Sequence, residues 1–155
     1  MLNDLLIEEP IRNALKEDIG FSDITTEALV PSDKFVTAYM KTRVDGVLCG
    51  TSIVKKVFEL LSDKAKITFS KKDGDVLKAG DVIAIITAPA RCILTGERVA
   101  LNFVRQMSGI ATETAKYIKA MNNPNVRLTD TRKTTPGFRV FEKYAVRTGG
   151  GVPHR

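Results

Sequence analysis

Two kinds of hydrophobic pattern alternate along the first 121 residues of the chain. Some segments carry apolar side chains at steps of three and four residues, which is the period of an amphipathic helix. Others alternate apolar and polar side chains, or form short apolar runs, as strands do. The predicted helices are residues 3–18, 50–61 and 89–121, and the predicted strands are residues 35–44, 66–71 and 82–87, with a further short run at 47–49.

Glycine, proline and aspartate mark the breaks between these elements. Residues 17–31 are turn-rich, and Asp45-Gly46 predicts a hairpin-type turn. Pro10 lies awkwardly inside the first helix and could divide it into two pieces. Ser108-Gly109 predicts a bend or a close helix contact, because glycine inside a helix costs about 1 kcal/mol relative to alanine.

The C-terminal part has a different layout. A short strand is predicted over residues 126–131, then a loop over 132–137 and a helix over 139–147, which three glycines end. A single strand–loop–helix unit cannot bury both faces of its strand, and parallel α/β architectures need several such units. We therefore expect a small α+β unit up to residue 88, a connecting helix, and one unit of a larger α/β architecture.

The composition is typical of a soluble globular protein. Of the 155 residues, 43% are apolar and 27% are charged. No apolar run approaches the roughly 18 residues of a membrane span, and the N-terminus lacks the layout of a signal peptide. Cys49 and Cys92 show no metal-binding spacing. We expect two buried, unreactive thiols and a cytoplasmic protein.

The positive charge is concentrated at the C-terminal end. The chain has a net charge of +6. Residues 126–155 hold seven lysines and arginines against two acidic residues, a net charge of +5, so the first 125 residues contribute only +1. An anionic ligand is the expected partner of such a segment.

The strongest candidate for chemistry is the run from Asp130 to Gly137, where the predicted strand ends and a loop begins. Ligands of α/β barrels bind at that edge. Arg132 can hold a carboxylate through two parallel hydrogen bonds, and Lys133 adds a compact charge beside it. Thr131 offers a hydroxyl group. The alternative is a solvated basic loop.

Two further stretches are weaker candidates. His154 is the only histidine, and with Arg155 it follows three glycines that permit a close backbone approach. A lone terminal histidine without a special role is the alternative. Arg98 follows Glu97 on the long predicted helix, where an exposed helical pair is the simpler interpretation.

Two other classes of protein share features with this sequence. Residues 72–83 resemble the strand–turn pattern of lipoyl and biotinyl carrier domains, but no lysine lies between small residues or methionines at a hairpin tip. We interpret this stretch as a structural turn. The basic segment could bind nucleic-acid phosphates, but it contains no recognisable stacking platform or finger, so we predict no nucleic-acid partner.

Several runs together resemble the quinolinate phosphoribosyltransferase family, in the family's order and with similar intervals. The most specific is Thr-Arg-Lys-Thr-Thr-Pro-Gly at 131–137. The others are residues 14–26, 95–103, 108–112 and 142–155. The resemblance covers essentially the whole chain. Position 153 is Pro where the family generally has Asn, which removes an amide donor before His154.

The resemblance implies a fold and an activity. An α+β, hammerhead-like N-terminal sandwich with its connecting helix would span residues 1–110, and residues 111–155 would begin an α/β barrel that is incomplete in this chain. The activity would be phosphoribosyl transfer from phosphoribosyl pyrophosphate to quinolinate with decarboxylation, in NAD biosynthesis. The products would be nicotinate mononucleotide, pyrophosphate and CO₂. The enzyme would be a homodimer or a dimer-based oligomer. Mg²⁺ would enter with phosphoribosyl pyrophosphate, with its ligands beyond residue 155.

The resemblance also implies roles for individual residues. Arg132, Lys133 and Arg155 would hold the two carboxylates of quinolinate, and Lys133 is the candidate catalytic group. Thr131 and His154 would line the same site, and Arg98 would reach into the site of a partner subunit. We expect this chain to be inactive alone. A non-catalytic hammerhead-type binding module and a molybdenum-transport-linked paralogue remain the alternatives.

Overall fold

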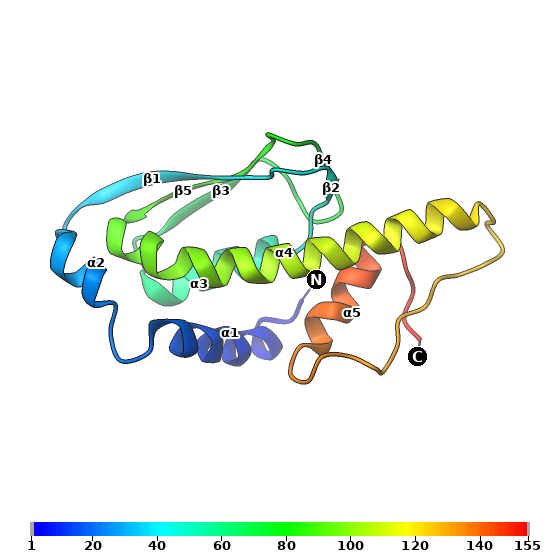
Figure 1. Ribbon diagram of the computed structural model, residues 1–155, viewed down its shortest axis with the longest axis horizontal. Helices are drawn as coiled ribbons and strands as arrows, with labels where there is room; N and C mark the ends of the chain where they lie inside the picture. The colour runs from blue at the N-terminus through cyan, green and yellow to red at the C-terminus, as the bar shows by residue number, and fades with distance from the viewer. Residues whose placement is uncertain (1, 155) are drawn as a thin grey trace.

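A computed structural model describes residues 2–154. It contains a sheet packed on helices, joined by one long helix to a smaller C-terminal unit (Figure 1). The helices are α1 (Asp4–Ile19), α2 (Ile24–Leu29), α3 (Thr51–Leu61), α4 (Ala90–Met121) and α5 (Arg139–Thr148). The strands are β1 (Phe35–Lys41), β2 (Gly46–Val47), β3 (Lys66–Phe69), β4 (Val76–Leu77) and β5 (Val82–Pro89).

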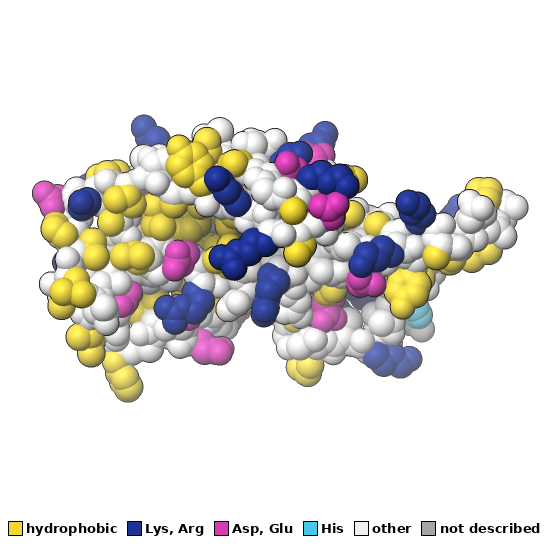
Figure 2. Space-filling model, turned by 45° about the horizontal axis from the view of Figure 1, so that its top comes forward, with side chains coloured by type: hydrophobic (Ala, Val, Ile, Leu, Met, Phe, Trp, Pro, Cys, Tyr) yellow, Lys and Arg dark blue, Asp and Glu magenta, His cyan; other side chains and the backbone are white. Residues whose placement is uncertain are grey.

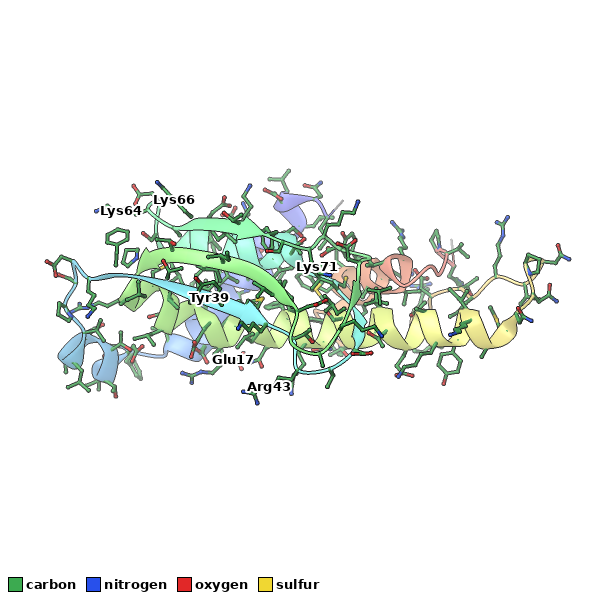
Figure 3. The ribbon with its side chains drawn as sticks, turned by 90° about the horizontal axis from the view of Figure 1, so that it is seen from above. Glu17, Tyr39, Arg43, Lys64, Lys66 and Lys71 are labelled. Carbon is green, nitrogen blue, oxygen red and sulfur yellow. The ribbon has the colours of Figure 1, made fainter. Side chains whose placement is uncertain are left out.

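The main sheet is antiparallel, in the order β1-β5-β3, and β2 pairs separately with β4. Alternation of side chains gives the sheet two different faces. Ala84, Ile86 and Ala88 of the central strand β5 are buried in the core. The opposite face is open: Tyr39 is 60% exposed, and Lys66 of β3 lies on the same outer side (Figure 3). The sheet is therefore covered on one face only.

The helices α1, α3 and α4 pack together beneath the sheet, where the core is continuous from the sheet to α5. Gly96 allows α3 and α4 to approach closely, because a Cβ atom there would lie 2.8 Å from Leu61 and 2.9 Å from the Phe58 ring. The helix α1 is continuous through Pro10, so the predicted single helix is confirmed and the alternative of two pieces is wrong. Apolar side chains remain exposed over the half of the molecule that holds the sheet and α2 (Figure 2).

The helix α2 lies where the sequence predicted turns. The Asp23 side chain accepts a hydrogen bond from the Thr26 amide at 3.2 Å and caps the first turn. The Arg91 guanidinium donates to the carbonyl oxygens of Glu27 at 3.0 Å and Val30 at 2.8 Å. Arg91 belongs to α4, so the contact that stabilises the end of α2 comes from more than 60 residues away.

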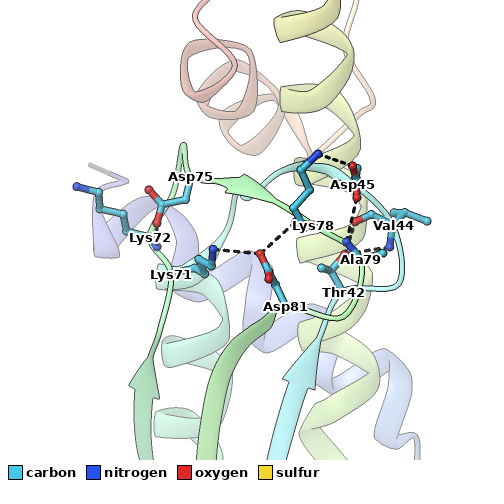
Figure 4. Close-up of polar contacts among 9 residues, drawn as sticks. All are labelled: Thr42, Val44, Asp45, Lys71, Lys72, Asp75, Lys78, Ala79 and Asp81. Atoms are coloured by element: carbon cyan, nitrogen blue, oxygen red, sulfur yellow. Dashed lines mark hydrogen bonds and ion pairs between the residues drawn. The ribbon is translucent and has the colours of Figure 1, made fainter.

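Asp45-Gly46 does not form the predicted hairpin turn, because β2 pairs with β4 and not with β1. Asp45 instead joins two loops: its carboxylate accepts from the Lys78 ammonium at 2.8 Å and from the Ala79 amide at 2.9 Å (Figure 4). Asp81 binds Lys71 in the same cluster, at 3.0 Å. Residues 72–83 therefore act as a structural turn, and the Lys78 side chain is held by an ion pair.

The helix α4 runs without interruption through Ser108-Gly109, so the predicted bend is wrong. The alternative, a close contact, is present at Ser108 alone: its hydroxyl accepts from the Cys49 amide at 2.9 Å and donates to the Cys49 carbonyl oxygen at 3.2 Å. A Cβ atom on Gly109 would have nothing within 4 Å. The helix also crosses the predicted domain boundary at residue 110, which stays a prediction. None of the helices within residues 2–154 combines the length and apolar character that a bilayer span requires.

Candidate functional site

Two chain segments lie side by side at the C-terminal end of the molecule. Thr129 and Val152 form a parallel bridge. The Asp130 amide donates to the Val152 carbonyl oxygen at 3.1 Å, and the Val152 amide donates to the Leu128 carbonyl oxygen at 2.9 Å. The strand predicted over residues 126–131 is reduced to this bridge. Because the segments are parallel, the residues that follow Asp130 and Val152 emerge at the same edge.

The three glycines at 149–151 bring the second segment into place. A Cβ atom on Gly149 would overlap the Ala111 carbonyl oxygen of α4 and would lie 2.7 Å from the Thr114 Cβ atom. Gly150 has a φ angle of 96°, in the region that favours glycine. On Gly151 a Cβ atom would lie 2.6 Å from a Val146 methyl group. The backbone after α5 therefore packs directly on α4 and on α5 itself.

Asp130 joins the two segments through its side chain, which is only 2% exposed. One carboxylate oxygen, Oδ1, accepts from the Lys143 ammonium and from the His154 amide, the latter at 3.0 Å. Burial alone would raise the pKa of Asp130, but these two hydrogen bonds and the charge of Lys143 outweigh it and lower the pKa below its usual 3.8. Asp130 is therefore a fixed anion that positions the backbone at His154.

The predicted ligand-binding side chains lie on the surface beside this anion. Thr131, Arg132 and Lys133 follow Asp130 directly and are exposed, and His154 is exposed on the adjacent segment. The Lys133 amide donates to the Thr131 hydroxyl at 3.1 Å, which shapes the start of the loop. Arg155 lies outside the described residues. The structure thus brings four of the six predicted site residues to one edge, and their roles remain predictions.

The helix α5 supplies contacts that sequence reasoning did not identify. The Arg139 guanidinium donates to the Thr134 hydroxyl at 2.9 Å and to the Arg132 carbonyl oxygen at 3.2 Å. The Thr135 amide donates to Glu142 at 3.3 Å. A signal was present in the sequence, because positions 139, 142 and 143 are polar at helical spacing whereas Phe141 and Ala145 are apolar and buried.

The opposite face of α5 is anchored on the rest of the molecule. Phe141 packs between Phe103 of α4 and Phe138, with ring centroids 4.9 and 4.8 Å apart. The Tyr144 hydroxyl donates to Asp73 at 2.9 Å, and Asp73 also accepts from the two backbone amides at the start of α3, those of residues 50 and 51. Burial raises the pKa of Tyr144, and the Asp73 carboxylate raises it further. The N-terminal unit and α5 therefore form one packed body.

Arg98 lies apart from these residues. It lines a cleft of about 280 Å³ between the α1–α2 connection and α4, and none of residues 130–154 lines that cleft. The Arg98 Nε atom is 3.5 Å from Asp18, and the Arg98 side chain is 68% exposed. Exposed apolar side chains adjoin the cleft, among them Ile24 at 74% and Leu94 at 40%. The structure therefore does not bring Arg98 to the other predicted residues of its own chain.

Within residues 2–154 no group of three or more histidine, cysteine or acidic side chains is arranged to hold a metal ion. Both thiols are buried and unpaired. Burial raises the pKa of Cys49 to about 12 and that of Cys92 to about 11, so both stay protonated at neutral pH. The expectation of buried, unreactive thiols agrees with this burial.

The architecture is a small α+β sandwich that leads through a long helix into a parallel bridge, a loop and a helix, with two exposed cations directly after the bridged segment. In α/β barrels this is the edge at which ligands bind. Comparison with known proteins identifies the family. The family model described as "Quinolinate phosphoribosyl transferase, N-terminal domain" matches residues 23–108, and that described as "Quinolinate phosphoribosyl transferase, C-terminal domain" matches residues 110–155. The chain belongs to the quinolinate phosphoribosyl transferase family.

Individual relatives agree with this assignment. The chain is 40% identical over 154 residues to the probable carboxylating nicotinate-nucleotide pyrophosphorylase of Bacillus subtilis (strain 168), covering 99% of this chain and 53% of that protein. The carboxylating nicotinate-nucleotide pyrophosphorylase of Mycobacterium leprae (strain TN) is 42% identical over 150 residues, which cover 95% of this chain and 53% of that protein. The chain spans about half the length of the curated relatives it matches.

Solved structures show the same fold. The crystal structure of NadC from Streptococcus pyogenes superposes with a TM-score of 0.97 at 39% identity, and covers all of this chain and 55% of that one. The nicotinate-nucleotide pyrophosphorylase from Francisella tularensis gives a TM-score of 0.93 at 38% identity, also over the whole of this chain and 55% of that one. The predicted fold class, an N-terminal α+β sandwich followed by the first part of an α/β barrel, is confirmed.

Proposed function

We propose that this chain contributes the dicarboxylate-binding part of an enzyme that transfers a phosphoribosyl group to quinolinate and removes one carboxylate as CO₂. The products are nicotinate mononucleotide, pyrophosphate and CO₂. The single observation that supports this most strongly is the pair of exposed cations, Arg132 and Lys133, at the end of a segment that the buried Asp130 anchors. The names of the relatives, carboxylating nicotinate-nucleotide pyrophosphorylases, point to the same reaction.

The chemistry explains why cations are needed at this edge. Quinolinate carries two adjacent carboxylates on a small ring, and the enzyme must remove it from water and orient it. Arg132 binds one carboxylate through a planar pair of donors, and Lys133 and Arg155 add charges to the other. Orientation aims the ring nitrogen at the ribose carbon as pyrophosphate leaves. After that bond forms, the positive charge of the ring nitrogen stabilises the electron pair that the departing CO₂ leaves on the adjacent carbon, and a proton from water adds to that carbon to give nicotinate mononucleotide.

Arg98 serves a second subunit in this proposal. None of the residues at the cationic edge of its own chain lines the cleft that holds Arg98. Its guanidinium is mostly exposed, and the apolar side chains around it, such as Ile24, are exposed as well. Exposed apolar surface beside a charged group is typical of an interface between protein chains. A homodimer would cover this surface and would bring Arg98 to the partner's quinolinate.

The described residues, 2–154, do not form a binding site for Mg²⁺. The one buried carboxylate of the C-terminal unit, that of Asp130, is already held by Lys143 and by the His154 amide. No other acidic group joins it to form a metal site within residues 2–154. In this proposal Mg²⁺ arrives bound to phosphoribosyl pyrophosphate, and its protein ligands lie outside these residues.

A titration with two pyridine acids tests the binding role. The ¹⁵N-labelled chain is titrated with quinolinate and, as the matched control, with nicotinate, which lacks the second carboxylate. We expect shifts at the amides of residues 131–135 and 154, and a dissociation constant for quinolinate at least about tenfold below that for nicotinate, because one charged hydrogen-bonded group contributes roughly 1.5–3 kcal/mol. Equal affinity for the two acids would contradict the proposal.

A turnover assay tests the catalytic part. The chain is incubated with quinolinate, phosphoribosyl pyrophosphate and Mg²⁺, and nicotinate mononucleotide is measured by chromatography. We expect no product from this chain alone, because its described residues offer no metal site. Formation of the mononucleotide at a rate of about 1 per second or faster, as is common for enzymes, would refute that expectation.

A further inference from the structure

The helix α5 presents one polar face to the loop that carries Arg132 and Lys133. Arg139, Glu142 and Lys143 occupy this face at steps of three and four residues, so their side chains project in the same direction. The other face of α5 is buried, with Phe141 and Ala145 fully enclosed. The helix is therefore fixed on one side and free to bind the loop on the other.

Each of the three polar side chains binds a different part of residues 130–135. Lys143 binds the Asp130 carboxylate. Glu142 accepts from the Thr135 amide at 3.3 Å. Arg139 binds two groups, the Arg132 carbonyl oxygen at 3.2 Å and the Thr134 hydroxyl at 2.9 Å. These bonds hold the backbone of the loop and leave the side chains of residues 131–133 exposed.

The contact between Arg139 and Arg132 needs an explanation, because the two side chains carry like charges. Like charges near one another repel unless opposite charge or hydrogen bonds compensate. Arg139 directs its guanidinium to the carbonyl oxygen of Arg132 and not to its side chain. A planar guanidinium can bind two acceptors at fixed angles, whereas a lysine ammonium is a flexible point charge. Arg139 therefore fixes where the Arg132 backbone lies.

We propose that Arg139 is a positioning residue for Arg132, with Glu142 as its partner at the other end of the loop. This inference rests on the proposed function, because it assumes that Arg132 binds a substrate carboxylate. Arg139 prepares the loop before the ligand arrives, so less conformational freedom is lost on binding. Its Nε–H and one terminal nitrogen are already engaged with the loop, which distinguishes it from a residue that holds the ligand directly.

The test uses the ¹⁵N-labelled chain and measures two quantities. The first is the order of the 131–135 backbone without ligand, from heteronuclear relaxation and amide exchange. The second is the dissociation constant for quinolinate. The substitutions are Arg139→Met and Arg139→Lys, with Arg127→Met as the matched control, since Arg127 is exposed and makes no side-chain hydrogen bond or ion pair with residues 2–154. Arg132→Met tests the proposed function itself.

We expect Arg139→Met to loosen the loop and to raise the dissociation constant about tenfold, and Arg139→Lys to raise it by at least about fivefold despite its retained charge. Arg127→Met should change it less than twofold and leave the loop ordered. Because Arg139 is exposed, these variants should keep the dispersed spectrum of the folded chain. An ordered loop in both Arg139 variants would overturn the inference, whatever happens to affinity.

The two proposals fail in different ways. If Arg132→Met leaves quinolinate affinity unchanged, or the unsubstituted chain does not bind quinolinate, the proposed function fails, while loop order still tests the role of Arg139. If Arg132→Met weakens binding but both Arg139 variants bind like the unsubstituted chain, only the positioning role fails. Weaker binding by Arg139→Met with an undisturbed free loop would mean that Arg139 touches the ligand, which also overturns positioning.

Discussion

Gly149 provides a sharp test of how the C-terminal segment is held, because replacing it with alanine adds one methyl group where no space exists. The new Cβ atom would overlap the Ala111 carbonyl oxygen and lie 2.7 Å from the Thr114 Cβ atom. The first atom belongs to the backbone of α4 and the second is bonded to it, both at buried positions of the helix, so neither can rotate away. Overpacking of this kind costs about 1–3 kcal/mol, and we expect Gly149→Ala to lie near the upper end, at about 3 kcal/mol.

The assay is urea unfolding followed by circular dichroism at 222 nm. With a dependence on urea of about 2 kcal/mol per molar, the transition midpoint should fall by about 1.5 M. Gly109→Ala is the matched control on α4: it has nothing within 4 Å, lies in a helix interior and is exposed. That variant should be more stable by about 1 kcal/mol, because alanine is the better helix former. A Gly149→Ala chain as stable as the unsubstituted one would refute the packing described here.

Three further outcomes follow from the structure. The lowered pKa of Asp130 means that its carboxylate stabilises the folded chain above the unfolded pKa of about 3.8 and that this contribution is lost as the pH falls through the folded value. In urea melts, the difference in free energy of unfolding between Asp130→Asn and the unsubstituted chain should therefore be larger at pH 7 than at pH 3. An equal difference at the two pH values would contradict the claim that Asp130 is ionised in the folded chain. Cys49 and Cys92, with pKa values of about 12 and 11, should resist a disulfide reagent at pH 8 and yield two thiol equivalents after addition of guanidinium; rapid reaction of the folded chain would contradict their burial. Ile24→Asp should leave the fold intact, since the side chain is 74% exposed, but should shift a dimer to monomer in sedimentation; an unchanged molecular mass would count against an interface at the Arg98 cleft.

The strongly periodic elements were predictable from the sequence, because their own side chains determine them. The helices α3 and α4 follow from apolar residues at helical steps, and β5 from a short apolar run. The helix α2 was missed because its stabilising contact is remote: Arg91 binds its last carbonyl groups from another helix. Asp45-Gly46 was misinterpreted for a related reason, since Asp45 binds Lys78 and Ala79 in a distant loop.

The ligand-facing residues of the candidate site were predictable from the sequence. The residues that hold them in place were not. Arg132 and Lys133 were candidates because they follow a predicted strand end, but a solvated basic loop would give the same pattern, and the resemblance to the family assigned them their roles. Asp130 was included in the motif, but its burial and its bond to the His154 amide depend on how two segments pair. Arg139 was overlooked because an exposed arginine on a short helix looks like ordinary surface charge until the loop it binds is visible.

The central claim is that cations at the chain's C-terminal edge bind both acidic groups of one pyridine ring, and calorimetric titration with quinolinate measures this directly. Hydrogen bonds to charged groups contribute roughly 1.5–3 kcal/mol each. Replacing both Arg132 and Arg155 with methionine should therefore raise the dissociation constant for quinolinate by at least about 100-fold. If the doubly substituted chain, still folded, binds quinolinate as tightly as the unsubstituted chain, the site lies elsewhere and the account is wrong.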